Sequence, residues 1–488
     1  MIKDFLRSSA NVLFADIGTK AIGFGVLSLL TFILEPEILG KYNALLTTIT
    51  SIYGMSGLGL SMVLQRESAK HSVKSGIYLG EIISAGFMCM SISILGLVVL
   101  FQIFHDKING ALFGGIDSSL IQWVPWLTLL YFLVQAPLSL ILGLGMFKVY
   151  SFRNMIEAIV TGICILIGGK MWGLPGVIYG LLVSYSINAI IVGIIIKKVF
   201  VEKRIQLVIT NWVKLAYQSL RKGIPYFVGN VFLGSVANII LIGLFAKHIG
   251  FAELGYLRIG LSLAAILMVV PNAAKTVTVT YIAKQEANST RLQSIQMRYL
   301  FFLIVTSTLL LTIILAPVVS FIFGNEYDAG VQIYIMILLI NIFISIYSVL
   351  NSFIAGKGHL VFSGLVSGIV MGMYILLAIF LIPTIGINGY YISFGGSYFT
   401  GMIILIVYDL RMNAYNDKRK IIWFLSGTFG ILGIAFLYSI CLQRSWLFNL
   451  LFLSIIGMYI LFCTKYVFES DEKKFVNQII SKARFIGR

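Results

Sequence analysis

The sequence predicts an all-α membrane protein that crosses the bilayer about fourteen times. Of its 488 residues, 59% are hydrophobic and 11% are charged, whereas a soluble domain has about 45–50% apolar and about 25% charged residues. The mean hydropathy of +0.97 points the same way. An outer-membrane β-barrel would need polar residues alternating along its strands to face its lumen. These observations exclude a soluble globule, a disordered chain and an outer-membrane barrel, and they leave a polytopic helical protein.

Uncharged runs long enough to cross about 30 Å of hydrocarbon, roughly 20 residues, place the membrane spans. The longest run, 360–408, must hold two helices, and the segment Pro383 to Gly389 is its natural break. Three weaker spans contain or adjoin charges. The fourteen expected spans are, in order, 8–34, 42–65, 82–104, 118–147, 154–170, 171–196, 223–246, 255–275, 299–325, 329–356, two within 360–408, 421–443 and 445–464.

The distribution of cations predicts the topology. With both termini in the cytoplasm, 29 Lys and Arg residues fall in cytoplasmic segments and five in outer loops, as the positive-inside rule requires. The net charge of +17 is therefore mostly a topology signal, and no nucleic-acid partner is expected. In the longest cytoplasmic segment, 197–222, residues 205–220 read as a basic amphipathic helix lying on the inner leaflet.

Short sequence matches at an offset of 213–215 residues indicate an internal repeat. Glu37 to Tyr42 resembles Ala252 to Leu257, and Gly173-Leu-Pro-Gly176 resembles Gly386-Ile-Asn-Gly389. We expect two pseudo-symmetric six-helix lobes in the same orientation, with a central cavity between them. The expected organisation is an N-lobe in 1–197 (spans 1–6), a cytoplasmic amphipathic linker in 198–222, a C-lobe in 223–410 (spans 7–12), and spans 13–14 with a basic cytoplasmic tail in 411–488.

The segment Glu35 to Tyr42, followed by a span and then by Gly57-Leu-Gly59 and Gln65-Arg66-Glu67, resembles the start of polysaccharide flippases. These are the O-antigen (Wzx-type) members of the multidrug/oligosaccharidyl-lipid/polysaccharide (MOP) exporter superfamily. The Gly-x-x-Gly pairs before spans 6 and 12 are similar to that family as well. The resemblance implies translocation of an undecaprenyl-diphosphate-linked oligosaccharide from the inner to the outer leaflet of the bacterial inner membrane, as in lipopolysaccharide biosynthesis. It also implies membrane lipids as partners, with a polysaccharide polymerase and a chain-length regulator as further candidates.

Ionisable residues inside spans are candidate functional groups, because each costs about 2.5–3.5 kcal/mol at the centre of a helix. Asp16 and Lys20 are four residues apart and share one face of the first span. One interpretation is a cavity-facing cation for the substrate diphosphate, with Asp16 holding it or relaying a proton. The other is a self-neutralised pair that stabilises the helix.

Three further cations are candidate substrate ligands. Arg258 lies about one turn inside the outer end of its span and suits bidentate phosphate binding, or it snorkels to the interface. Lys275 is a ligand candidate or, more simply, an inner-interface anchor. Arg153 and Glu157 open the fifth span four residues apart, and an interfacial ion pair is the simpler interpretation. The candidate substrate-binding set is thus Lys20, Arg258, Asp16, Lys275 and Arg153, and the ion-coupling candidates are Asp16 and Glu157.

Motifs for chemistry are missing from the sequence. It has no P-loop, no metal-ligand spacing and no Ser/His/Asp set outside the membrane, so we expect no catalytic residue, no metal, no cofactor and no enzyme activity. We expect alternating access driven by an ion gradient or the membrane potential. A multidrug or small-solute antiporter of the same superfamily is the alternative, and its site would be more apolar with a lone acid. A membrane polysaccharide polymerase is a third possibility, but the outer loops are too short for its expected outer domain.

Overall fold

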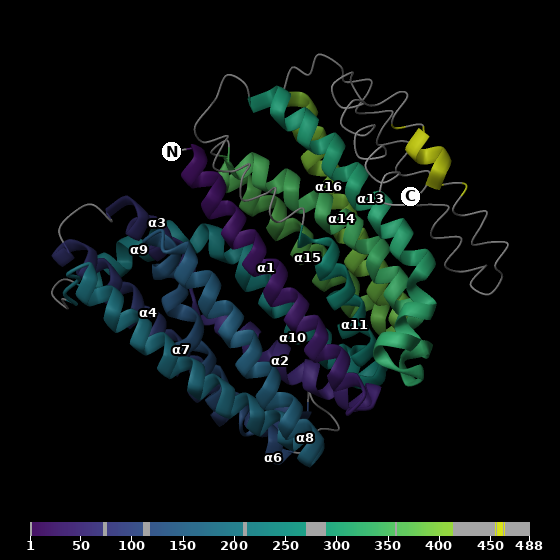
Figure 1. Cartoon of the computed structure of the whole chain (residues 1–488), viewed down its shortest axis with the longest axis horizontal. Helices are drawn as coiled ribbons and strands as arrows, with labels where there is room; N and C mark the ends of the chain where they lie inside the picture. The colour runs from purple at the N-terminus through teal and green to yellow at the C-terminus, as the bar shows by residue number, and fades with distance from the viewer. Residues whose placement is uncertain are drawn as a thin grey trace, which may run out of the picture.

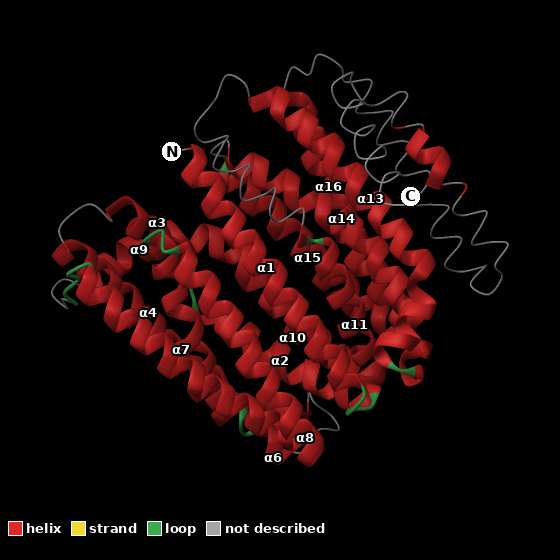
Figure 2. Ribbon diagram, in the orientation of Figure 1, coloured by secondary structure: helices red, strands yellow, loops and turns green. Residues whose placement is uncertain are grey.

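The protein is helical throughout the part of the chain that its computed structural model describes, namely residues 2–71, 76–110, 118–207, 212–269, 289–356, 359–412 and eight positions within 454–463. Within these residues no strand occurs, and short loops join the helices (Figure 2). Predicted span 13 lies outside the described residues, and only a short helical stretch of predicted span 14 is described.

Helices from the first half of the chain form one group, purple to blue in Figure 1. Within it α1 packs along α8, and α7 packs against α8, α3 and α2. The helices of this group are α1 (Ile2–Thr31), α2 (Pro36–Ser56), α3 (Leu60–His71), α4 (Gly76–Ile103), α5 (His105–Ile108), α6 (Ser118–Ile121), α7 (Val124–Gly143) and α8 (Phe147–Glu202).

Helices from the second half form the other group, teal to green in Figure 1. Within it α15 packs along α16, and α14 packs against α11, α13 and α16. Its elements are the π-helix η2 (Val228–Phe232), α10 (Leu233–His248), α11 (Phe251–Leu267), α13 (Ser289–Phe323), the 3-10 helix η3 (Asn325–Gly330), α14 (Val331–Gly356), α15 (Leu360–Ile385) and α16 (Ile387–Met412). Helix α9 (Trp212–Phe227) also comes from the second half of the chain, but it lies beside α3 and α4 of the first group (Figure 1).

Apolar surface confirms that this is a polytopic membrane fold. Large apolar side chains such as Ile103, Val361 and Phe380 are 68%, 71% and 69% exposed, which water does not tolerate over whole helix faces. Six segments of the described chain are long and apolar enough to span a bilayer, the longest of them folded back on itself. They are Leu79–Ile103, Val124–Gly143, Lys148–Glu202, Asn325–Ile354, Val361–Ile385 and Ile387–Tyr408.

Two helical hairpins show the same backbone geometry at the predicted repeat offset. The long α8 turns back at Gly173, with φ 61° and ψ −135°, and α15 meets α16 at Gly386, with φ 60° and ψ −135°. Only glycine adopts these angles readily. The two positions are 213 residues apart, and so are Gly176 and Gly389, where each second helix touches the backbone of the first. The uncharged run 360–408 therefore breaks inside the predicted segment, and the matching geometry supports a duplication.

The second predicted span, 42–65, is interrupted in the structure. Helix α2 ends at Ser56, and α3 begins at Leu60. Between them Leu58 and Gly59 have φ values of 47° and 74°, a left-handed conformation that an α-helix cannot contain. The Gly57-Leu-Gly59 motif is thus a turn that redirects the chain rather than a site of helix packing.

The predicted amphipathic helix over 205–220 is displaced in the structure. Residues 205–207 are not helical, because α8 ends at Glu202 and Arg204 then adopts a left-handed conformation with φ 52°. Helix α9 begins at Trp212 and continues without a break through the π-helix η2 into α10. The amphipathic segment and the seventh predicted span are therefore one continuous element with a π-bulge, a feature frequent at functional sites.

The two groups of helices touch most closely where α2 crosses α11. A Cβ atom on Gly40 would lie 1.7 Å from the Phe251 carbonyl oxygen, and one on Gly255 would lie 2.1 Å from the Pro36 carbonyl oxygen. The two contacts are equivalent, because Gly40 and Gly255 are 215 positions apart and so are Pro36 and Phe251. Each half therefore makes the same contact on the other. We call this end of the molecule, where α1 ends and α2 and α11 begin, the closed end.

Polar and aromatic contacts add to the closed end. The Tyr327 hydroxyl donates to the Leu34 carbonyl oxygen at 2.6 Å, and the Ser28 hydroxyl donates to the Ile322 carbonyl oxygen at 2.6 Å. The rings of Phe24 and Phe323 meet edge to face at 5.5 Å. Each buried hydrogen bond contributes about 0.5–1.5 kcal/mol. The closed end is therefore stabilised by several weak contacts rather than by one strong interaction.

Candidate functional site

A cavity of about 260 Å³ lies among α1, α2, α8 and α11. Most of its lining comes from the first half of the chain, and Arg258 on α11 is the contribution of the second half. Its walls are largely aliphatic, but several polar groups line it. These polar residues are Thr19, Tyr42, Asn154, Glu157, Thr161, Tyr185 and Arg258.

Three donors in this cavity are buried without hydrogen-bond partners in the described part of the chain. They are the Nε atom of Arg258 and the hydroxyl groups of Thr19 and Thr161. Buried polar groups are nearly always paired, so orphaned donors call for an explanation. Three of the eleven buried polar atoms of this kind in the described chain belong to residues that line this cavity, and a ligand or water with oxygen acceptors would satisfy them there.

Glu157 is the acidic residue that lines the cavity, and the positive charge of Arg153 balances its negative charge. Its carboxylate accepts a hydrogen bond from the Arg153 guanidinium at 2.6 Å and one from the Gln135 amide at 3.0 Å. The Arg153 side chain is 1% exposed and also donates to the Asn154 side chain at 3.0 Å and to the Val134 carbonyl oxygen at 3.3 Å. Because Arg153 balances the charge of Glu157, the charge of Arg258 gives the cavity a local excess of positive charge.

The predicted site residues divide by their placement. Arg258 and Glu157 line the cavity, and Arg153 lies behind Glu157 as an ion-pair partner, buried rather than at an interface. Lys20 lies on α1 next to the lining residue Thr19, and its ammonium group donates to the Ala265 carbonyl oxygen on α11 at 3.3 Å. The Asp16 side chain and Lys275 lie outside the described residues.

Sequence reasoning missed the neutral polar residues of the cavity. Tyr185 lines it, and its ring packs at 5.5 Å from that of Tyr131, which packs at 5.2 Å from Tyr53. Neutral hydroxyl groups carry little insertion cost, so a search for misplaced charge cannot find them. The one available signal was Tyr42, which closes the Glu35 to Tyr42 motif and lines the cavity.

Fold and cavity together define a class of protein. It is a polytopic helical membrane protein in which two groups of helices with repeated geometry meet at a closed end. The two groups share a largely aliphatic cavity that also contains polar groups and charges of both signs. The described residues contain no group of His, Cys, Asp and Glu side chains that could hold a metal ion.

The chain belongs to the polysaccharide biosynthesis protein family, whose sequence model matches residues 5–284. Its structure is similar to that of the lipid II flippase MurJ in an inward closed conformation, with a TM-score of 0.67 and 16% identity over 94% of this chain and 98% of that one.

Two MATE transporters of known structure are also similar. An inward-facing MATE family transporter of the MOP superfamily gives a TM-score of 0.59 at 14% identity, over 84% of this chain and 99% of that one. The eukaryotic MATE transporter AtDTX14 gives 0.57 at 15% identity, over 84% of this chain and 96% of that one. No curated protein matches the chain. At these identities the structures establish the fold alone, which confirms the predicted polytopic all-α architecture.

Proposed function

We propose that the chain is a flippase that moves an undecaprenyl-diphosphate-linked oligosaccharide, such as an O-antigen repeat unit, from the cytoplasmic to the periplasmic leaflet of the bacterial inner membrane. Membership of a polysaccharide biosynthesis family and a fold shared with a lipid II flippase support this proposal. The observation that carries it is Arg258, a cation with an orphaned donor in a shared cavity. A guanidinium binds phosphate oxygens through paired, charge-assisted hydrogen bonds.

The size of the cavity suggests which part of the substrate it holds. Pockets for drug-sized ligands measure about 300–1,000 Å³, so a cavity of about 260 Å³ fits a diphosphate or one sugar and not a whole oligosaccharide. We propose that the diphosphate docks at Arg258, with Lys20 as a second cation. The remaining sugars occupy space between the two groups of helices, and the polyprenyl tail stays in lipid.

The composition of the cavity supports our proposal of alternating access. Arg258 comes from one half of the chain and the other lining groups mostly from the other half, so a relative movement of the halves changes the site. With both termini in the cytoplasm, the closed end faces the periplasm, and its opening releases the substrate there. The substrate therefore binds the two arrangements with different affinities, as any ligand that shifts a conformational equilibrium must.

Energy coupling is proposed for the acids of the N-terminal half. Asp16 and Glu157 are the candidates, and moving one elementary charge across the membrane is worth about 2.3 kcal/mol per 100 mV. Glu157 is held by Arg153 and Gln135, so Arg153 acts on the substrate through Glu157 rather than by direct contact. Lys275 remains a proposed ligand at the cytoplasmic end, and a polymerase and a chain-length regulator remain proposed partners.

A multidrug or small-solute antiporter is the second candidate, favoured by the MATE-like fold. Such a site is expected to be apolar with a lone acid. In this cavity the acid is paired with Arg153, and the Nε atom of the cation Arg258 has no hydrogen-bond partner, so the lipid-linked anion is better supported.

The test is complementation of cells that lack this protein and make the glycan. A chain with Lys20→Ala and Arg258→Ala should lose export, and Arg258→Gln alone should slow it about 10- to 100-fold, because a hydrogen bond to a charged group is worth about 1.5–3 kcal/mol. Lys107→Ala with Lys170→Ala, at two exposed lysines, is the matched control. Export at the wild-type rate by the Lys20/Arg258 variant would place the diphosphate site elsewhere.

A further inference from the structure

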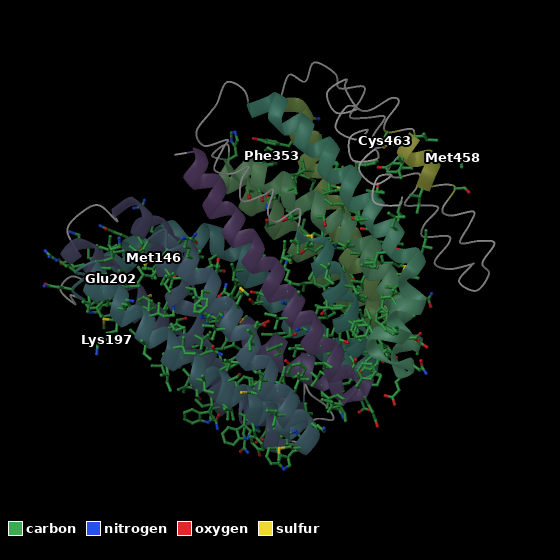
Figure 3. The ribbon with its side chains drawn as sticks, viewed as in Figure 1. Met146, Lys197, Glu202, Phe353, Met458 and Cys463 are labelled. Atoms are coloured by element: carbon green, nitrogen blue, oxygen red, sulfur yellow. The ribbon has the colours of Figure 1, made fainter. Side chains whose placement is uncertain are left out.

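Basic and apolar side chains are exposed together where α8 leads into α9. Lys197 and Glu202 lie at the end of the N-terminal group of helices, near Met146 (Figure 3). Among the residues of 197–224 whose side chains the structure describes, six cations are exposed, against a single exposed acid, Glu202. The cations are Lys197, Lys198, Lys203, Arg204, Lys214 and Arg221. The same segment exposes Val201 and Leu207, at 72% and 56%.

Helix α9 presents this mixture on separate faces. Ala216 and Phe227 are buried, and the helix packs against α3 and α4 of the first half (Figure 1). Val213, Tyr217 and Ile224 are spaced i, i+4 and i+11, which places them on one face. They are exposed by 62%, 67% and 44%.

The charged edge of α9 lies beside this apolar stripe. Lys214 and Arg221 are exposed. They follow Val213 by one and eight positions, which places both of them about a quarter of a turn round the helix from it. An apolar stripe with cations along one side is the arrangement of a helix that lies in a membrane interface. The apolar face enters the acyl boundary, and the cations stay at the level of the headgroups.

The segment before α9 is fixed to the body of the protein. Ile205 is buried with Leu79, Ile83 and Leu140 in a small cluster of its own. At the neighbouring position the Gln206 carbonyl oxygen lies so close to Gly80 on α4 that no side chain fits between them. The orientation of the exposed surface relative to α4 is therefore set by packing.

We propose that the exposed side chains described in 197–207 and 212–224 form a docking surface for anionic phospholipid, which holds the connection between the two halves of the chain at the headgroup level. Charge complementarity selects the occupant: five net positive charges face an anionic leaflet. The exposed apolar stripe needs acyl chains beside those headgroups. The inference is independent of the transported substrate, because none of these residues lines the cavity.

The test measures phospholipid binding to the full-length protein by native mass spectrometry, titrating phosphatidylglycerol and phosphatidylcholine in separate series. The wild type should prefer phosphatidylglycerol. Lys214→Gln with Arg221→Gln should weaken phosphatidylglycerol binding roughly 30-fold, since each surface cation contributes a factor of about five. The control pair Lys107→Gln with Lys170→Gln removes two exposed lysines from other segments and should change nothing.

A second variant tests the apolar stripe without a change of charge. Tyr217→Gln should weaken binding of both lipids alike and leave the ratio between them intact, because the stripe contacts acyl chains. If the wild type does not prefer phosphatidylglycerol over phosphatidylcholine, the proposal is wrong, whatever the variants do. The surface would then be a candidate for binding a protein partner. An equal loss in the control pair overturns it too.

Discussion

Replacing Gly40 by alanine should loosen the closed end. The new Cβ atom would lie 1.7 Å from the Phe251 carbonyl oxygen, and real Cβ atoms essentially never come within 3.0 Å of another heavy atom. Helices α2 and α11 must therefore move apart by at least about 1.3 Å at this crossing. The atoms that the new Cβ would meet are backbone atoms of α11, so no side chain can rotate away to make room.

The size of the effect follows from the cost of overpacking, typically about 1–3 kcal/mol. That cost falls on the closed arrangement and is absent when the two halves part. The ratio of closed to open molecules should therefore fall about 5- to 150-fold. Gly255→Ala should act in the same direction, because its Cβ atom would lie 2.1 Å from the Pro36 carbonyl oxygen in the repeat-related contact.

The assay is the distance distribution between spin labels on either side of the crossing. Labels at the exposed positions Glu37 and Glu326 report on α2 and η3, in a chain whose four native cysteines are replaced. Gly96→Ala and Gly396→Ala are the controls, since a Cβ atom at either position meets nothing within 4 Å. They also account for the greater helix propensity of alanine. A distribution in Gly40→Ala identical to that of the controls would refute the reasoning.

The other predictions concern stability and are read from thermal denaturation of the purified protein. Gly386→Ala should destabilise by about 1–3 kcal/mol, because alanine is strained at φ 60° and ψ −135°, whereas Gly396→Ala should be tolerated; equal stability of the two would contradict the hairpin argument. Arg153→Gln should lower the free energy of unfolding by up to about 3–5 kcal/mol, because Glu157 then lacks the positive charge that balances it. A second change, Glu157→Gln, should restore much of this loss. Additive losses from the two changes would contradict the pairing. Tyr327→Phe should lower the free energy of unfolding by about 0.5–1.5 kcal/mol, because the hydrogen bond to the α1–α2 loop is lost. An unchanged melting temperature would count against that bond.

Much of the fold could be predicted because hydrocarbon imposes a simple rule on sequence. Uncharged runs must be helices, and a described helix overlaps each of the first twelve predicted spans. The break in 360–408 could be located because Gly386 needs a conformation that other residues avoid. The turn at Leu58 could not, since it lies within an apolar run and depends on how α3 packs against α7.

The site was harder to predict because it depends on how the two halves meet. Intramembrane charge pointed to Arg258 and Glu157, which line one cavity. It could not distinguish Arg153, whose partners make it a buried support, from a residue that faces the substrate. Nor could it find Thr19 and Thr161, whose hydroxyl groups matter only because no neighbour satisfies them.

The most direct test of the proposed flippase is the membrane face on which its substrate accumulates. Cells that make the glycan but lack this protein are treated with periodate before and after permeabilisation, and the lipid-linked oligosaccharide is extracted. We predict single repeat units that resist periodate until the membrane is permeabilised, because they remain on the cytoplasmic leaflet. Single units already oxidised in intact cells would contradict the account and indicate a polymerase or ligase defect. An unchanged glycan would contradict it in favour of a drug or solute antiporter.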